Sequence, residues 1–418
     1  MSINKDSQKA PNIRFKGFTD DWEQRELENL VTRVKSYSLS RSVETNSDTN
    51  TKYIHYGDIH THVADKIEKG TKLPNIIPGD YETLNKGDLV LADASEDYQG
   101  IATPAIVMTQ TDYSLVAGLH TIALRPIKID SLYLYYLIKS STFRKYGYKV
   151  GTGMKVFGIS VNRLLEFKAF MPITEEQSKI AELLLLMDKS ITLHQRKLDQ
   201  LNQLKEALLH QMFPGKGETV PKLRFAGFEG DWEERKLGNL LHERNQKSVQ
   251  TEEYPLVSFT VENGVTEKTE RYNRNQLVSG DSDAKVYKVT KLNDIVYNPA
   301  NLKFGAIDRN KYGKAVFSPI YVTFEVIEDY IFAEFIEFIV TSQTFIGRAL
   351  KYQQGTVYER QSVGVDDFLN LTIRIPNLDE QKLIGLFLND LNKELLLQKD
   401  KLDQLKNMKQ VLLQNMFI

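Results

Sequence analysis

The chain has 418 residues, contains no cysteine, and carries 54 lysine and arginine residues against 55 acidic residues. This length predicts more than one domain, and a hydrophobic share of 41% is typical of a globular chain. The lack of cysteine excludes disulfides, cysteine-ligated zinc and a thiol nucleophile. A polar N-terminus and the lack of any run of 18 apolar residues predict a cytoplasmic protein that does not span a membrane. The net charge of −1 gives no overall sign of nucleic-acid binding.

The first motif of the chain recurs in its second half. Residues 11–30, PNIRFKGFTDDWEQRELENL, align without a gap with residues 221–240, PKLRFAGFEGDWEERKLGNL, and 12 of the 20 positions are identical. Residues 172–213 align in the same way with residues 376–417, with 17 of 42 positions identical. The chain is therefore predicted to be two copies of one plan, each with a similar head, a divergent middle and a similar tail.

This repeat sets the expected domain boundaries. We assign residues 1–171 to a first domain, 172–213 to a long helix, 214–220 to a linker, 221–375 to a second domain, and 376–418 to a second long helix. The heads and tails remain similar whereas the middles differ, as expected if the ends form a common frame and the middles bind different targets.

Both middles combine short β-rich runs with an aromatic, amphipathic stretch. The runs 88–92 and 120–125 in the first middle, and 294–297 and 321–326 in the second, are expected to be strands. Residues 132–148 and 330–352 have apolar side chains at helical spacing. The pattern predicts α+β domains, with the head tryptophans Trp22 and Trp232 packed into them.

One stretch of the first middle is strongly basic. Residues 131–165 contain no acidic residue, and six lysine or arginine residues alternate there with aromatic residues. Such a face beside a Gly-Thr-Gly turn could lie on a nucleic-acid backbone. The alternative is that the aromatic residues form core and the lysines are merely solvated. The charge of the two middles, +3 and −2, does not decide between these interpretations.

The tails have the pattern of coiled-coil helices. From Leu184 to Met212, and from Leu388 to Met416, nine positions spaced alternately by three and four residues are apolar at seven of the nine in each copy. The simplest partner for each stripe is the other tail of the same chain, and an intermolecular coiled coil is the alternative.

A search of the sequence finds no catalytic motif. It lacks a P-loop, an HExxH zinc motif and a GxSxG nucleophile elbow, and its seven histidines form no ligand cluster. Residues 298–301, Asn-Pro-Ala-Asn, resemble the catalytic loop of adenine methyltransferases only superficially and are interpreted as a turn.

The doubled motifs resemble those of the specificity subunit of type I restriction–modification systems. They are the head Arg-Phe-x-Gly-Phe-x-x-x-Trp, the Pro-x-x-x-Glu-Gln start of each tail, its Leu-Leu-x-x-Met-Phe end, and the tract 293–307. The resemblance implies two target recognition domains with a pseudo-twofold repeat, joined by two long antiparallel coiled-coil helices. Each domain would read one half of a bipartite site in double-stranded DNA, and the helices would set the gap between the halves.

The resemblance also implies partners. The subunit itself would be non-catalytic and without a cofactor, and it would dock two modification subunits that use S-adenosylmethionine to methylate adenine. Restriction subunits that use ATP and Mg²⁺ could join the complex. Two other functions remain open: a self-contained DNA methyltransferase or nuclease with an unrecognised site, and a coiled-coil adaptor that does not bind DNA.

Candidate DNA-binding residues lie in the loop after each central strand and in the Gly-Thr region. Amide side chains suit adenine, cations suit guanine or phosphate, and carboxylates can accept from cytosine. In the first domain the candidates are Asp93, Ser95, Tyr98, Arg144, Lys145, Lys149, Thr152 and Lys155, and in the second Asn298, Asn301, Lys303, Thr356, Tyr358 and Arg360. Lys155 aligns with Glu359, so a phosphate contact shared by both domains is in doubt at that position.

Overall fold

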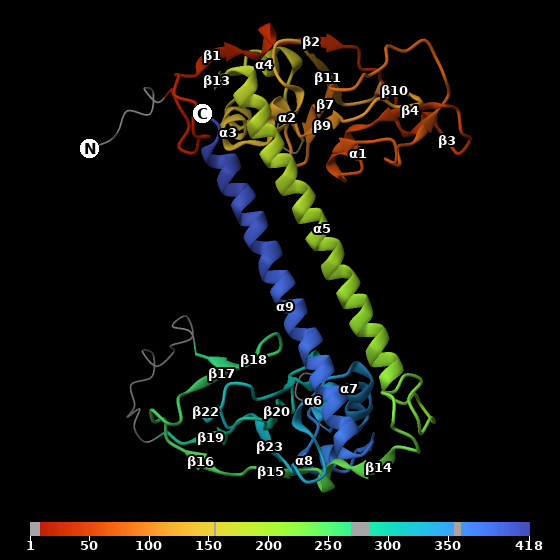
Figure 1. Ribbon diagram of the computed structural model, residues 1–418, viewed down its shortest axis with the longest axis vertical. Coiled ribbons are helices and arrows are strands. Elements are labelled where there is room, and N and C mark those ends of the chain that lie inside the picture. The colour runs from red at the N-terminus through yellow and green to blue at the C-terminus, as the bar shows by residue number, and fades with distance from the viewer. Residues whose placement is uncertain (1–8, 154–155, 269–284, 355–360) are drawn as a thin grey trace. The chain divides into compact units, whose positions relative to one another are not determined.

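The computed structural model of the chain describes residues 9–153, 156–268, 285–354 and 361–418 (Figure 1). The chain divides into two compact units, of which unit 1 holds the residues up to Arg196 together with Asp400–Ile418, and unit 2 holds Lys197–Lys399. The long helices α5 (Thr174–Met212) and α9 (Leu378–Asn415) therefore each contribute to both units.

Unit 1 is built on two mixed sheets. The larger has the strand order β2-β11-β7-β9-β5, from Val31–Val34, Thr121–Pro126, Leu89–Ala92, Pro104–Val107 and Lys66–Ile67. The other has the order β10-β4-β6-β3, from Ser114–Ala117, Thr51–Ile54, Asn75–Ile76 and Glu44–Thr45. The expected strands at 88–92 and 120–125 are confirmed as β7 and β11, which pair antiparallel with Ile122 opposite Leu91.

Short elements complete unit 1. The head strand β1 (Glu23–Glu26) pairs with β13 (Lys168–Met171), and β8 (Ala94–Ser95) pairs with β12 (Phe157–Gly158). The remaining helices are η2 (Leu27–Asn29), η3 (Arg41–Val43), α1 (Tyr56–His60), α2 (Ser131–Lys139), α3 (Ser141–Val150) and α4 (Val161–Leu165).

Unit 2 repeats the central part of this plan. Its larger sheet has the order β15-β23-β20-β21, from Leu241–Glu243, Val322–Val326, Ile295–Tyr297 and Ile307–Arg309. A second sheet has the order β16-β19-β22, from Lys247–Ser248, Tyr287–Thr290 and Ala315–Phe317. Two antiparallel pairs are β17 (Val257–Thr260) with β18 (Gly264–Glu267), and β14 (Glu233–Lys236) with β24 (Thr372–Ile375). The expected strands at 294–297 and 321–326 are confirmed as β20 and β23.

The helices of unit 2 include α6 (Ala333–Val340), α7 (Gln343–Ala349) and α8 (Val365–Leu369), with the 3-10 turns η4 (Leu237–Asn239), η8 (Leu302–Phe304) and η9 (Leu350–Tyr352). The helical character expected at 132–148 and 330–352 is confirmed, but each stretch is divided into two helices. Ser140 has extended backbone and separates α2 from α3, and its hydroxyl donates to the Leu137 carbonyl over 2.6 Å. Ser342 separates α6 from α7 and accepts a hydrogen bond from the Phe345 amide. A serine at the start of a second helix can satisfy free backbone groups at the break.

The repeated motifs form the same lock in both units. The Arg14 guanidinium makes a bidentate ion pair with the fully buried Glu176 at 2.8 and 2.9 Å, and Arg224 pairs with the fully buried Glu380 in the same way. The neighbouring Gln177 accepts from the Asp130 amide and donates to the Pro172 carbonyl. The Arg of each head therefore holds the Glu at the start of each long helix.

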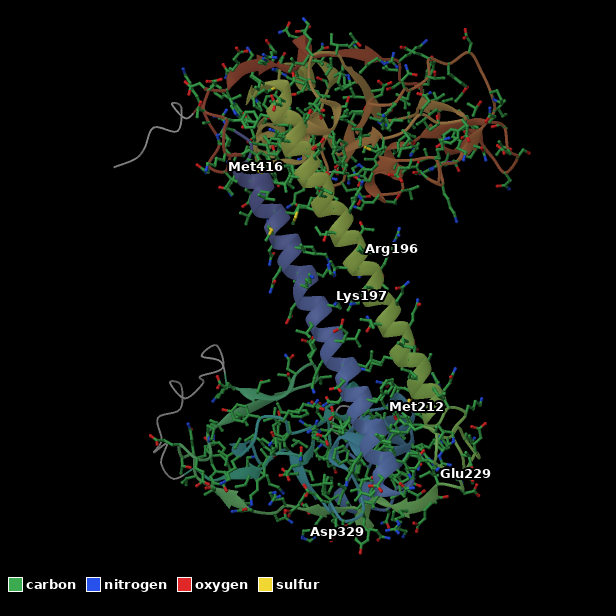
Figure 2. All side chains as sticks on the ribbon, in the orientation of Figure 1. Arg196, Lys197, Met212, Glu229, Asp329 and Met416 are labelled. Atoms are coloured by element: carbon green, nitrogen blue, oxygen red, sulfur yellow. The ribbon has the colours of Figure 1, made fainter. Side chains whose placement is uncertain are left out.

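Each core is closed by the end of the other repeat's tail. In unit 1, Met416 and Phe417, which directly follow α9, join the core that contains Trp22. In unit 2, Met212 at the end of α5 joins the core that contains Trp232, and the Phe213 ring packs 6.0 Å from the Trp232 ring. Figure 2 labels Met416 and Met212, one in each unit. The head and middle of each repeat therefore depend on the tail of the other repeat to complete their core.

The apolar stripe of both long helices is turned away from solvent. All nine positions from Leu184 to Met212, and all nine from Leu388 to Met416, are buried or half-buried, including the polar His194, Lys205 and Gln398. Among the described residues, no helix combines the length and apolar character needed to cross a membrane.

A charged network joins α5 and α9 inside unit 1. The Asp188 carboxylate accepts from Lys66 at 2.8 Å, from the Tyr136 hydroxyl at 2.7 Å, and from Lys409 on α9. Burial alone would raise the pKa of Asp188, but the ammonium groups of Lys66 and Lys409 outweigh it and lower the pKa below the usual range. The network stabilises the charged form of Asp188 and ties the end of α9 to the first domain.

Replacing Asp188 with asparagine is expected to cost unit 1 about 3 kcal/mol at pH 7, because Lys409 then loses this carboxylate and Lys66 keeps only its pair with Asp65. The folded pKa of Asp188 is depressed, so its contribution is present above the unfolded pKa of about 3.9 and is lost as the pH falls through the folded pKa. Urea unfolding, followed by Trp22 fluorescence in a Trp232→Phe background, measures the free energy of unfolding of unit 1. The difference in this free energy between wild type and variant should become smaller at acidic pH. The control Glu166→Gln removes an exposed pair with Arg163 in the same unit and should change little.

Candidate DNA interface

The structure brings together the two predicted segments of unit 1. The loop that follows the central strand β7 contains β8, and β8 pairs antiparallel with β12, with Ser95 opposite Phe157 and Ala94 opposite Gly158. An isolated bridge also joins Thr152 to Gly158. Candidates that lie some 50 to 60 positions apart in the sequence therefore share one edge of the domain.

The loop side chains of unit 1 differ in their access to a ligand. Asp93 is partly exposed, and its Oδ1 lies 3.2 Å from Nδ1 of His120. Ser95 is buried and supports the turn by accepting from the Asp97 amide. Tyr98 is half-buried, with its ring centroid 3.9 Å from that of Phe157. Of these three, Asp93 is the side chain most available for contact with a base edge.

Arg144 has a different role from the one expected. Its guanidinium donates to the carbonyls of Gln99 and Ile101 at 2.7 and 2.6 Å, and to the carbonyl of Ile138 at 2.7 Å. Burial lowers the pKa of Arg144 to about 10. The loop after β7 (residues 93–103) and its counterpart after β20 (residues 298–306) are called the recognition loops below. Because its donors are occupied by backbone carbonyls, we assign Arg144 to holding the recognition loop of unit 1 against α2 and not to a phosphate contact.

The other basic candidates of unit 1 remain at the surface. Lys145 and Lys149 are exposed and, four residues apart on α3, lie on the same face of that helix. Thr152 is also exposed, just after the helix. Lys155 lies outside the described residues. The two lysines are therefore the described candidates best placed to contact phosphate.

The loop of unit 2 is a turn, as the sequence predicted. Asn298 is buried, and its side-chain oxygen accepts from the amides of Ala300 and Asn301 at 3.1 and 3.3 Å. This leaves Asn301 and Phe304 exposed and Lys303 half-buried on the following turn, η8. Gly305 ends the turn with a φ of +83°, a conformation that favours glycine.

The same pairing of segments occurs in unit 2. The Val363 amide donates to the Pro299 carbonyl at 3.2 Å, and the Tyr297 hydroxyl donates to the Val363 carbonyl at 3.1 Å. Gln354 and Ser362 form a bridge on either side of the Gly-Thr region. The candidates Thr356, Tyr358 and Arg360 lie outside the described residues.

Sequence reasoning missed a groove beside the loop of unit 1. A cavity of about 520 Å³ is lined by Arg33 of β2, by Lys35 just after that strand, and by Asp93, Thr121 and Ser160. Arg33 and Lys35 are exposed on either side of the buried Val34 at the end of β2, and this local alternation is the signal that could have identified them. Within the described part of the chain, no group of three or more His, Asp or Glu side chains is arranged to hold a metal ion.

Comparison with known proteins identifies the class. Residues 19–203 match the family model described as the type I restriction modification DNA specificity domain. This match and the relatives that follow confirm the resemblance to type I restriction–modification specificity subunits noted in the motifs.

Particular relatives span nearly the whole chain. A putative type I restriction enzyme specificity subunit, MjaX, from Methanocaldococcus jannaschii is 22% identical over 93% of this chain and 91% of its own length. The crystal structure of a type I restriction–modification S subunit from M. genitalium has a TM-score of 0.62 at 14% identity, covering 98% of this chain and 99% of the other. The HsdS subunit from Thermoanaerobacter tengcongensis has a TM-score of 0.45 at 14% identity, over 94% and 95% of the two chains.

Proposed function

We propose that this chain selects the DNA sequence at which a type I restriction–modification complex acts, with each unit reading one half of a bipartite site. The observation that carries the proposal is the repeated arrangement of the loops. In both units the segment after the central strand is joined to the segment after the second helix, and these segments carry different side chains in the two units. Two domains with the same architecture but different loop side chains are suited to binding two different half-sites.

The side chains support a division of labour. Lys145 and Lys149 would contact phosphate and position the first domain, whereas Asp93 would accept from a base edge such as the cytosine amino group. In the second domain, Asn301 would read a base and Lys303 would contact guanine or phosphate. The recognition domains are residues 1–171 and 221–375, connected by the linker 214–220 and the spacer helices 172–213 and 376–418.

We assign the long helices to setting the gap between half-sites, as an antiparallel coiled coil within one chain. The inward stripe of α5 and α9 supports this role, as does the ion pair of Lys197 with Glu394 at 2.9 Å inside unit 2. Two weak readers on a stiff spacer bind tightly only when both half-sites have the right separation.

The partners follow from the family. Two modification subunits would bind S-adenosylmethionine and methylate an adenine in each half-site after flipping it out of the duplex. Restriction subunits with ATP and Mg²⁺ would complete a cleaving complex in the cytoplasm. The comparisons do not favour a self-contained methyltransferase or nuclease, nor an adaptor that does not bind DNA.

Methyl transfer tests this assignment. The purified chain with labelled S-adenosylmethionine and host DNA should transfer no methyl group, and addition of the modification subunit from the same genome should give transfer at one bipartite sequence. The control is the modification subunit alone, which should methylate little because it lacks the reader. Transfer by the isolated chain, or a methylation pattern that does not depend on the chain, would contradict the proposal.

A further inference from the structure

Each unit exposes an aromatic side chain at an equivalent place beside its recognition loop. Tyr148 near the end of α3 and Tyr352 at the end of η9 are separated by the 204 positions that align the Gly-Thr pairs of the two copies. They are 49% and 52% exposed. A second aromatic pair, Tyr98 and Phe304, is separated by the 206 positions that align β7 with β20, and Phe304 is 65% exposed. Exposed rings at matched positions of divergent domains point to a contact that both domains make.

The ring of Tyr148 packs against other aromatic side chains of unit 1. It stacks on Tyr98 with centroids 5.5 Å apart and planes 27° apart, and Tyr98 in turn packs on Phe157. Arg144 fixes the loop that carries Tyr98. In unit 2 the turn η8, which ends in Phe304, contacts α7, and α7 leads directly into η9 and Tyr352. A ring fixed in this way loses little conformational freedom when a ligand stacks on it.

Cations surround these rings. Lys145 lies three residues before Tyr148 on the same face of α3, and the exposed Lys149 directly follows Tyr148 in the chain. In unit 2 the exposed Lys351 precedes Tyr352, and Nζ of Lys303 lies 5.1 Å from the centroid of the Phe304 ring. A flat apolar surface bordered by cations suits a ligand that is both anionic and stackable, which describes a nucleic acid.

We propose that Tyr148 and Tyr352 stack on DNA bases, an inference that rests on the proposed function and names residues of the same interface. Each ring stacks on a base face that opens where the duplex is distorted at its half-site, while the neighbouring lysines contact phosphate. Every base has an apolar face, so stacking tolerates any sequence. This explains why the ring recurs in both units although the loop residues differ.

The test uses the full chain with its modification subunit and a fluorescein-labelled duplex that carries the mapped methylation site. Tyr148→Ala and Tyr352→Ala should each weaken binding by about 5- to 150-fold, the equivalent of losing one stacked base. Tyr148→Leu, which keeps apolar bulk but lacks the flat ring, should lose nearly as much, and Tyr148→Phe should bind like wild type. The slope of log affinity against log salt should not change, whereas Lys149→Gln should reduce it by about 0.9.

The matched control is Tyr330→Ala. Tyr330 is 49% exposed in unit 2, beside Arg235 and away from the recognition loop, so its loss should leave affinity unchanged. Wild-type affinity of both Tyr→Ala variants, in a complex that still methylates its site, would overturn the stacking contact and leave the proposed function intact. A change of salt slope like that of Lys149→Gln would also overturn it, because the tyrosines would then act on phosphate. A wild-type complex that binds no DNA would overturn both.

Discussion

Replacing Arg14 with alanine is expected to lower the free energy of unfolding of unit 1 by about 3–5 kcal/mol, because Glu176 is left charged and buried without its cation. The pair is bidentate and lies where the head meets the first turn of α5. Urea unfolding in the Trp232→Phe background isolates this unit, since Trp22 is then the only tryptophan in the chain. The equivalent change Arg224→Ala should affect unit 2, observed through Trp232 in a Trp22→Phe background.

The control for this prediction is Arg25→Ala. Arg25 pairs with Glu23 at 2.8 Å, but both side chains are exposed, so the loss should stay within about 1 kcal/mol. An apolar double variant, Arg14→Met with Glu176→Leu, should recover much of the stability, since it removes the unpaired charge as well as the pair. If Arg14→Ala cost no more than Arg25→Ala, the head motif would not be a structural lock.

Insertion of one heptad into both long helices is expected to lengthen the gap in the recognised DNA sequence by about three base pairs, since seven residues add about 10.5 Å at 1.5 Å per residue. The insertions belong after Arg196 in α5 and after Lys399 in α9, where the chain passes from one unit to the other. Figure 2 labels Arg196 and Lys197 on α5. A heptad keeps the apolar stripe in phase, so both helices should remain packed. Mapping methylated adenines in cells that carry each variant measures the gap directly.

An insertion in α5 alone is the control. It shifts one stripe against the other by a full repeat and should strongly reduce methylation at the original and at the lengthened site. If the doubly inserted protein methylated with an unchanged gap, the helices would not set the spacing.

The sequence motifs proved reliable where they described local properties. The doubled head and tail, the strands β7 and β20, and the length of α5 and α9 all follow from identity or periodicity along the chain. The repeated Arg and Glu-Gln were identified as motifs, but their function as a lock depends on a pairing across 162 positions, between Arg14 and Glu176. The residues around each motif do not indicate which distant residue it pairs with.

The candidate interface was predicted only in part for the same reason. The sequence placed candidates in two separate segments of each domain, and folding joins these segments through β8 with β12 and through Val363 with Pro299. Arg144 was expected at a basic surface, yet its donors bond carbonyls from the loop and from α2. Composition records that a residue is cationic and does not record which acceptors lie within reach of it.

The amino-acid sequence by itself determined that this protein is one plan written twice, with two divergent α+β domains and two long amphipathic helices. It could do so because repeats and apolar periodicity are properties of neighbouring residues. Only the tertiary structure decided how the two copies depend on each other: Met416 and Phe417 complete the core around Trp22, and Met212 completes the core around Trp232. The physical reason is that an apolar helix end is stabilised by whichever core it packs into, and no pattern of neighbouring residues records which core that is.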